Sequence, residues 1–384
     1  MEELGVFIFL LGTLFLIPKL VKKLDVPEQI TEILLGLLLG PFFLGVITDQ
    51  PIIEVMGTIG IIALFFVAGF EVDARSIVKK KKTLLENGML HLILIFIIAL
   101  IVALTGKNIT TALLIGIALV TPSAGFIFSA VRSLQLHGYI VEWIETKVIS
   151  AEVLSLLLLL IITNLSQPLQ LIIVISGFAA VCFLLPYILE FFFLHILGKT
   201  NMQADTFFIF VIAVGLAFTT HIIGVHYIIG AFIVGLIMRW ANESKHNQTS
   251  LNEERVIATF SSFTTIFVPF YFFSVGLMIN KGMMSWKNII FAILVFGAVI
   301  TIKILTSFIH RRLTLKESFK ASVMVALLTA PTLLFTFVTA EILYTTNSIS
   351  EDTYGVMVIY GLLTAGIPLV ANSIEKWIRK MRSI

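Results

Sequence analysis

Apolar runs long enough to cross a bilayer follow one another along almost the whole 384-residue chain. A helix of about 20 apolar residues crosses the roughly 30 Å of hydrocarbon in a membrane. Hydrophobic residues make up 58% of the chain and charged residues 13%, against about 45–50% and about 25% in soluble domains. No block of domain size is left for a water-soluble enzyme. The sequence therefore predicts an all-helical polytopic membrane protein that is not an enzyme.

The apolar runs predict about thirteen transmembrane helices. They cover approximately residues 4–18, 28–47, 52–72, 84–105, 109–134, 141–164, 169–194, 204–222, 225–241, 256–279, 288–310, 317–345 and 352–375. The first run lacks the basic residues that precede a secretory signal, so we expect it to be a retained helix. An odd number of spans places the two termini on opposite sides of the membrane.

The lysines and arginines test this topology, because cytoplasmic loops are enriched in basic residues. With the C-terminus inside, 21 of the 26 basic residues fall on the cytoplasmic face: Lys19, Lys22, Lys23, Arg75, Lys79, Lys80, Lys81, Lys82, Arg132, Lys199, Arg239, Lys245, Arg255, Arg311, Arg312, Lys316, Lys320, Lys376, Arg379, Lys380 and Arg382. Lys107, Lys281 and Lys287 fall outside. We therefore expect an inner-membrane protein with its N-terminus outside and its C-terminus in the cytoplasm.

The same residues limit the possible partners and cofactors. The basic clusters lie between apolar runs and form no continuous face, so we expect contact with the bilayer and none with nucleic acid. The single cysteine, Cys182, excludes a disulfide framework and a Cys-based metal site. No nucleotide site and no cofactor are expected.

Two of the long apolar runs are interrupted near their centres, at ALVTPSAGFIF (118–128) and at ALLTAPTLLF (326–335). Proline removes a backbone donor and clashes with the preceding turn, so each helix must kink or unwind there. The interruptions comprise Thr121, Pro122 and Ser123 in one run and Thr329, Pro331 and Thr332 in the other. The two runs cross the membrane in opposite directions at matching places in two halves of six helices. This pattern predicts an inverted repeat with two broken helices, as in alternating-access transporters.

The two deepest charges in the chain are Glu152 and Lys303. At 1.5 Å per residue, Glu152 lies about 16 Å along its helix and Lys303 about 22 Å along its own, both towards the middle of the bilayer. Charges at this depth are expensive and usually functional. An inert ion pair that fixes helix packing is the alternative. We place Lys147, Glu142 and Glu145 at the cytoplasmic mouth of the predicted helix 141–164, and we interpret His91 as a packing residue.

The chain resembles the monovalent cation/proton antiporters of the superfamily branch that includes sodium/proton exchangers and potassium-efflux antiporters. The resemblance covers nearly the whole chain and rests on the order of several segments as well as on Lys303. These segments are ILLGLLLGPFFLG (33–45), GTIGIIALFFVAGFEVD (57–73), IIGAFIVGLIM (228–238) and VPFYFFSVGLMIN (268–280).

The resemblance implies a homodimer in which each chain has a dimerisation domain and a mobile core. Residues 1–78 and 201–282 would form the dimerisation domain, residues 79–165 and 283–384 the core, and residues 166–200 a linker helix. The ion-binding acid of the family would correspond to Glu152, with Lys303 compensating charge. Two features depart from the family pattern: Ala151 replaces a polar residue before the acid, and Pro331 is followed by Thr332, Leu333 and Leu334 in place of a charged sequence.

The sequence therefore predicts a secondary transporter that exchanges sodium or potassium for protons. Hydroxyls beside Glu152 offer the hard oxygen ligands that an alkali cation needs. The candidate ligands are Glu152, Thr121, Ser123, Ser150 and Ser155. The two departures from the family pattern leave a second possibility open, an antiporter-derived membrane sensor or partner subunit without transport. A third is a sodium-coupled solute symporter.

Overall fold

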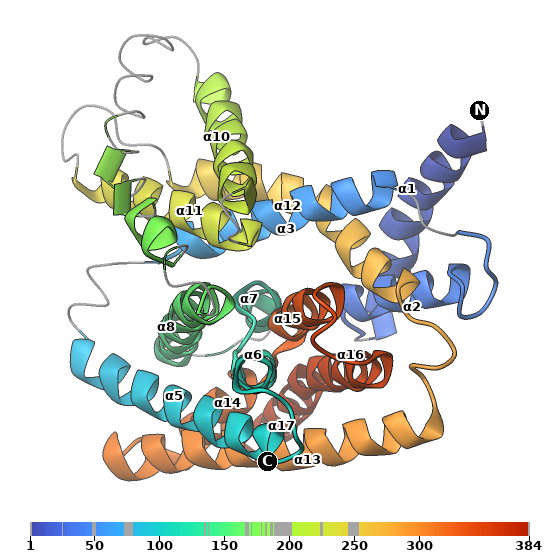
Figure 1. The fold of residues 1–384 in the computed structure, drawn as a ribbon. Coiled ribbons are helices and arrows are strands. Elements are labelled where there is room, and N and C mark those ends of the chain that lie inside the picture. The colour runs from blue at the N-terminus through green and yellow to red at the C-terminus, as the bar shows by residue number, and fades with distance from the viewer. Residues whose placement is uncertain are drawn as a thin grey trace. The chain divides into compact units, whose positions relative to one another are not determined.

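A computed structural model describes the residues in the ranges 2–24, 26–47, 51–72, 80–133, 138–165, 202–222, 226–244 and 253–382, with short pieces at 136, 169, 171–177, 179–180, 183–184 and 187. All regular structure within these ranges is helical (Figure 1). Half of the predicted linker helix 169–194, including Cys182, lies outside the described residues.

The chain divides into two compact units. The first comprises residues 1–48, 80–159 and 275–384, and the second comprises residues 49–79 and 160–274. The helices of the first unit are α1 (Glu2–Val21), η1 (Lys22–Leu24), α2 (Glu28–Leu39), α5 (Lys81–Ala103), α6 (Ile109–Val120), α7 (Ala124–Ser133), most of α8 (Gly138–Thr163), α13 (Trp286–Ile309), η2 (His310–Thr314), α14 (Phe319–Leu328), α15 (Leu333–Thr345), α16 (Glu351–Ala365) and α17 (Ile367–Arg382). Those of the second unit are α3 (Pro51–Phe70), α10 (Met202–Ile222), α11 (Tyr227–Ser244) and most of α12 (Glu253–Leu277). The division into a dimerisation domain and a core stays a prediction.

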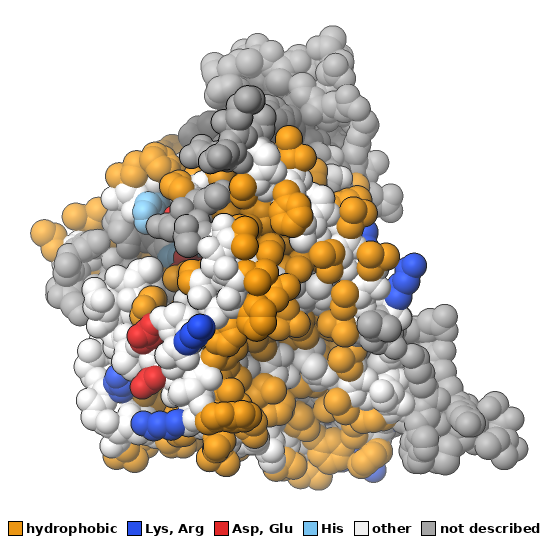
Figure 2. Space-filling view, turned by 90° about the vertical axis from the view of Figure 1, so that its right-hand side faces the viewer, with side chains coloured by type: hydrophobic (Ala, Val, Ile, Leu, Met, Phe, Trp, Pro, Cys, Tyr) orange, Lys and Arg blue, Asp and Glu red, His pale blue; other side chains and the backbone are white. Residues whose placement is uncertain are grey.

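The described residues include eight helical segments that are long and apolar enough to span a membrane, and three shorter apolar helices. The apolar surface of α5 and α13 is largely exposed: only 28% and 22% of their most apolar windows are buried. Side chains such as Phe96, Leu100, Phe291 and Leu294 contribute to this exposed surface. One face of the molecule is dominated by hydrophobic side chains (Figure 2). In a membrane protein such a surface faces lipid, so the predicted polytopic fold is confirmed.

The two broken helices are also confirmed. The predicted helix 109–134 is divided into α6 and α7, and the predicted helix 317–345 into α14 and α15. The segments 109–128 and 319–345 are each 89% buried over their most apolar windows, so they form the interior of their unit. In Figure 1, α6 lies between α5 and α15, and it packs against both. Helix α13 packs against α14 and α16.

Two predicted helices have different bounds. The predicted helix 28–47 ends at Leu39, because the glycine at 40 and the proline at 41 form a turn there. Its twelve residues span only about 18 Å. The predicted helix 352–375 consists of α16 and α17, which meet at Gly366. Pro368 lacks the N–H that would bond the Thr364 carbonyl, so the helix cannot continue unchanged through this point.

Close backbone packing joins α3 and α11 in the second unit. A Cβ atom on Gly69 would overlap the Phe232 carbonyl, and a Cβ atom on Gly235 would overlap the Phe66 carbonyl. Small residues let membrane helices approach to backbone contact in this way. Any larger residue at either glycine would force the two helices apart.

Candidate functional site

The first helix break leaves two backbone carbonyls of α6 without their usual helical donors. Pro122 has no N–H to give to the Ala118 carbonyl, and the N–H of Ser123 points away from the Leu119 carbonyl. Side chains from distant helices replace both donors. The Thr336 hydroxyl donates to the Ala118 carbonyl at 2.8 Å, and the Tyr360 hydroxyl donates to the Leu119 carbonyl at 2.7 Å. The break is therefore satisfied by the second half of the repeat.

Ser123 joins the first break to the second. Its Oγ accepts the N–H groups of Leu334 at 2.9 Å and Phe335 at 3.3 Å, which belong to the first turn of α15. Its own N–H donates to the Pro331 carbonyl at 3.0 Å. The first N–H groups of a helix have no partner within the helix. Ser123 thus acts as a cap for a helix more than 200 residues away in the chain.

Lys303 forms a hydrogen bond with the backbone of the second break. Its Nζ, on α13, donates to the Ala330 carbonyl at 2.6 Å. The side chain is 8% exposed, and the break beside it is closed further by the N–H of Thr332, which donates to the Thr364 hydroxyl at 3.3 Å. A break in a membrane helix is tolerated only where such partners exist. Lys303 therefore supplies both a positive charge and a donor at the second break.

Glu152 is 1% exposed, in the middle of α8. Ser155 follows it by three residues, so the two side chains lie on one face of the helix. Two other elements contact Ser155. The Thr121 hydroxyl at the first break donates to Ser155 Oγ at 2.7 Å, and Nε2 of His91 on α5 lies 2.8 Å from the same oxygen. The structure thus brings three of the predicted site residues, Glu152, Thr121 and Ser155, into one buried region.

A cavity opens beside this cluster, between α5, α8, α13 and the two breaks. Its lining consists of Asn87, Leu90, His91, Leu94, Val120, Pro122, Lys147, Ala151, Lys303, Thr306, Ser307, Ala326, Thr329 and Ala330. Pro122 itself lines the cavity, and Pro331 directly follows the lining residue Ala330. Residues from five separate segments converge on this space.

The other two predicted ligands, Ser150 and Ser123, form hydrogen bonds outside this cluster. The Ser150 hydroxyl donates to the Lys147 carbonyl at 2.9 Å in its own helix and lies 3.5 Å from the Asn87 amide. Thr329, predicted as part of the second break, lines the cavity, and its hydroxyl donates to the Val325 carbonyl of α14 at 2.8 Å. Ser123 is engaged as the cap of α15.

Sequence reasoning missed several polar residues of the cavity, among them Asn87, His91 and Lys147. Asn87 and His91 are four residues apart on α5, which places them on one helical face. That spacing was a usable signal in an otherwise apolar run. Lys147 lines the cavity, whereas the sequence placed it at the mouth of the predicted helix 141–164. Its Nζ donates to the Ser307 hydroxyl of α13.

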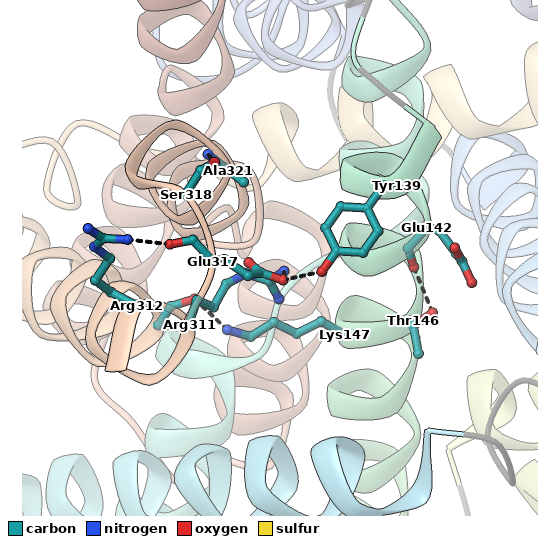
Figure 3. A network of polar contacts seen from close by, with 10 residues as sticks. Tyr139, Glu142, Thr146, Lys147, Arg311, Arg312, Glu317, Ser318 and Ala321 are labelled. Carbon is teal, nitrogen blue, oxygen red and sulfur yellow. Dashed lines mark hydrogen bonds and ion pairs between the residues drawn. The ribbon is translucent and has the colours of Figure 1, made fainter. Parts of the chain in front are cut away.

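A second polar cluster ties the start of α8 to the connection between α13 and α14 (Figure 3). Arg311 and Glu317 form an ion pair at 2.5 Å and are 2% and 8% exposed. The Tyr139 hydroxyl donates to the same Glu317 carboxylate at 2.6 Å, and Arg312 donates to the Glu317 carbonyl at 2.6 Å. Such a pair is strongly destabilising to break, because the remaining charge stays buried. The cluster therefore fixes α8 relative to α13 and α14.

Two broken helices that satisfy each other, with a buried carboxylate and a buried lysine beside them, are the architecture of an alternating-access ion transporter. Residues 6–372 match the family described as "Sodium/hydrogen exchanger, transmembrane". The chain therefore belongs to this family, whose members are transporters rather than enzymes.

Relatives and solved structures agree with this family. "Probable Na(+)/H(+) antiporter 3" of Methanocaldococcus jannaschii is 23% identical over 96% of both chains. The Na(+)/H(+) antiporter of Enterococcus hirae is 25% identical over 78% of this chain and 79% of its own. The sodium proton antiporter MjNhaP1 from Methanocaldococcus jannaschii, solved at pH 8, superposes with a TM-score of 0.69 at 19% identity, over 97% of this chain and 95% of that one. The last comparison establishes the shared fold.

Proposed function

We propose that Glu152 is the group of this exchanger that binds either a monovalent cation or a proton. The observation that carries the proposal is its position: a carboxylate 1% exposed at mid-helix, on the same face of α8 as a serine that is bonded to the first helix break. A membrane carboxylate at this depth is functional by default. Competition between cation and proton for one carboxylate couples the two fluxes. The cation is the substrate, and the reaction needs no cofactor.

The hydroxyls of Thr121 and Ser155 complete the proposed cation site. They are 2.7 Å apart and fully buried, and hydroxyl oxygens are suitable ligands for an alkali cation. Ser123 contributes less, because its oxygen is occupied by the N-terminus of α15. The relatives named above are sodium/proton antiporters, which favours sodium over potassium as the substrate.

Lys303 compensates charge when the site is empty. Its hydrogen bond to the Ala330 carbonyl also connects α13 to the second break. A change of charge at the ion site therefore acts, through Lys303, on the backbone of the second broken helix. In an alternating-access cycle the two broken helices move together as one body, because Ser123 and Thr336 bond them to each other. The dimer, the division into a dimerisation domain and a core, and the cytoplasmic C-terminus belong to the same proposal.

The test is the transport activity of Glu152→Gln in everted membrane vesicles, measured as sodium-driven proton movement. Gln keeps the shape of the side chain and removes the exchangeable proton, so we expect activity to fall to background. Glu142→Gln is the matched control. It lies ten residues away on the same helix, where it pairs with Lys80 in an exposed ion pair at 2.5 Å, and we expect it to retain activity. Normal exchange by Glu152→Gln would refute the assignment.

A further inference from the structure

Lys147 is the second lysine at the cavity, and it approaches from a different helix than Lys303. It precedes Glu152 by five residues on α8, about 7.5 Å along the helix axis. Its Nζ donates to the Ser307 hydroxyl, one turn beyond Lys303 on α13. The side chain therefore bridges α8 and α13 at the end of the cavity nearer to the Arg311–Glu317 pair.

The ammonium group of Lys147 donates to a neutral hydroxyl, that of Ser307. The Glu317 carboxylate lies in the same neighbourhood (Figure 3), but it already accepts hydrogen bonds from Arg311 and Tyr139. Arg311 and Lys303 are the cationic groups near Lys147 and repel its ammonium group, whereas the Glu317 carboxylate attracts it. The positive charge of Lys147 therefore acts electrostatically on any ion that enters the cavity.

The charged side chains that line the cavity are basic. Among its lining residues in the described part of the chain, the charged ones are Lys147 and Lys303, and there is no carboxylate. Glu152 lies next to the lining residue Ala151 and is the acidic group proposed to attract a cation. A cation that enters experiences this attraction together with repulsion from the lysines. Coulomb repulsion scales with the charge of the entering ion, so it acts twice as strongly on a divalent ion.

We infer that Lys147 is a specificity-determining residue that weakens cation binding by charge repulsion and thereby excludes divalent cations. The inference rests on the proposed function and deepens it. Ser307 holds the Lys147 ammonium beside the cavity, where its charge reaches the ion site without occupying the ligand positions of Thr121 and Ser155. The repulsion energy between Lys147 and a small divalent cation such as Mg²⁺ is twice that between Lys147 and a monovalent cation in the same position.

The test measures the sodium KM of exchange, and the inhibition of exchange by Mg²⁺, in proteoliposomes that contain the purified full chain. For Lys147→Gln we expect the sodium KM to fall by a factor of about three or more. The Mg²⁺ inhibition constant should fall by about the square of that factor, because the lost repulsion doubles with the charge of the ion. A loss of shape or packing predicts no such relation between the two ions.

Two further variants separate charge from structure. Lys147→Arg retains the positive charge, so we expect its sodium KM and its resistance to Mg²⁺ to stay near those of the wild type. Lys281→Gln removes an exposed lysine from the connection before α13 and is the control for a general change of surface charge. If Lys147→Gln does not transport, sodium and Mg²⁺ affinities of the purified variant, measured by thermal stabilisation, carry the same prediction.

Unchanged sodium and Mg²⁺ constants in Lys147→Gln, with normal wild-type exchange, would overturn this inference and leave the proposed function intact. The same values in Lys147→Arg as in Lys147→Gln would also overturn it, because charge would then not be the cause. If the wild type neither binds sodium nor exchanges it for protons, the proposed function fails and the inference fails with it.

Discussion

Replacing Ser123 with alanine should destabilise the protein through the second half of the repeat. The substitution removes one oxygen that accepts two buried N–H groups, those of Leu334 at 2.9 Å and Phe335 at 3.3 Å. The side chain of Ser123 is fully buried, so water does not readily replace it. A buried donor without a partner costs about 1–3 kcal/mol, and the longer bond contributes less. We therefore expect the free energy of unfolding to fall by about 2–4 kcal/mol.

The measurement is a reversible denaturant titration of the purified variant in mixed micelles, followed by tryptophan fluorescence. Ser373→Ala is the matched control. Its exposed hydroxyl donates to the Leu369 carbonyl of the same helix, so its loss should change the free energy of unfolding by no more than about 0.5 kcal/mol.

Equal stabilities of the Ser123→Ala and Ser373→Ala variants would refute the conclusion that the two breaks hold each other in place. A higher sodium KM without any loss of stability would instead assign Ser123 to the ion site.

Three further predictions concern the ion site. Thr121→Val and Ser155→Ala should each raise the sodium KM, and the double variant should show less than the sum of the two effects, because the hydroxyls are bonded to each other; additive effects on KM would contradict this. Lys303→Ala should shift the pH optimum of transport upward, since it removes a positive charge from a carboxylate site; an unchanged pH profile at full rate would show that Lys303 does not act on the site. If Lys303 keeps its proton throughout the cycle, one cation replaces one proton and exchange is electroneutral. The initial rate of sodium exchange should then be independent of a potential imposed with valinomycin and a potassium gradient, and a several-fold change would point to Lys303 as a second proton carrier.

The sequence was sufficient to predict the helical membrane fold and the two breaks. Pro122 and Pro331 each remove a backbone donor, and that effect is local, so it can be read from the chain without knowing its neighbours. The end of α2 had a comparable signal in Pro41, but the apolar run continued beyond it and suggested a longer helix. Pro368 was likewise a signal for the division between α16 and α17, but it lies close to the expected end of an apolar run, and the sequence predicted a single helix.

The partners of the broken segments could not be predicted in the same way. Ser123 and Leu334 are 211 residues apart in the chain, and Leu119 and Tyr360 are 241 apart. No local pattern states which hydroxyl replaces a lost backbone donor, because this depends on how the two halves cross. For this reason Ser123 was predicted as an ion ligand, whereas the structure shows it as a helix cap.

For a related reason, single polar residues on apolar helices were not assigned to the site from the sequence. His91 on its own is consistent with packing, and its role depends on Ser155, which lies 64 residues later. Lys147 is close to the expected membrane boundary in the sequence, but α8 extends about two turns before it, from Gly138. Its contact with Ser307 depends on the packing of α8 against α13. Glu152 was the leading candidate from the sequence, because a carboxylate so deep in an apolar run is costly to bury and therefore usually functional.

The most direct test of cation/proton exchange at Glu152 uses the purified protein in proteoliposomes that contain a pH-sensitive dye. Sodium, lithium and potassium gradients would be applied in turn across a range of pH, with wild type and Glu152→Gln compared at equal protein content. We predict that at least sodium drives proton movement in the wild type and that no cation does so in Glu152→Gln. A folded wild-type protein that moves no protons with any of the three cations would contradict cation/proton exchange and favour a sensor or partner subunit without transport. Sodium-dependent solute uptake without proton movement would instead identify a symporter.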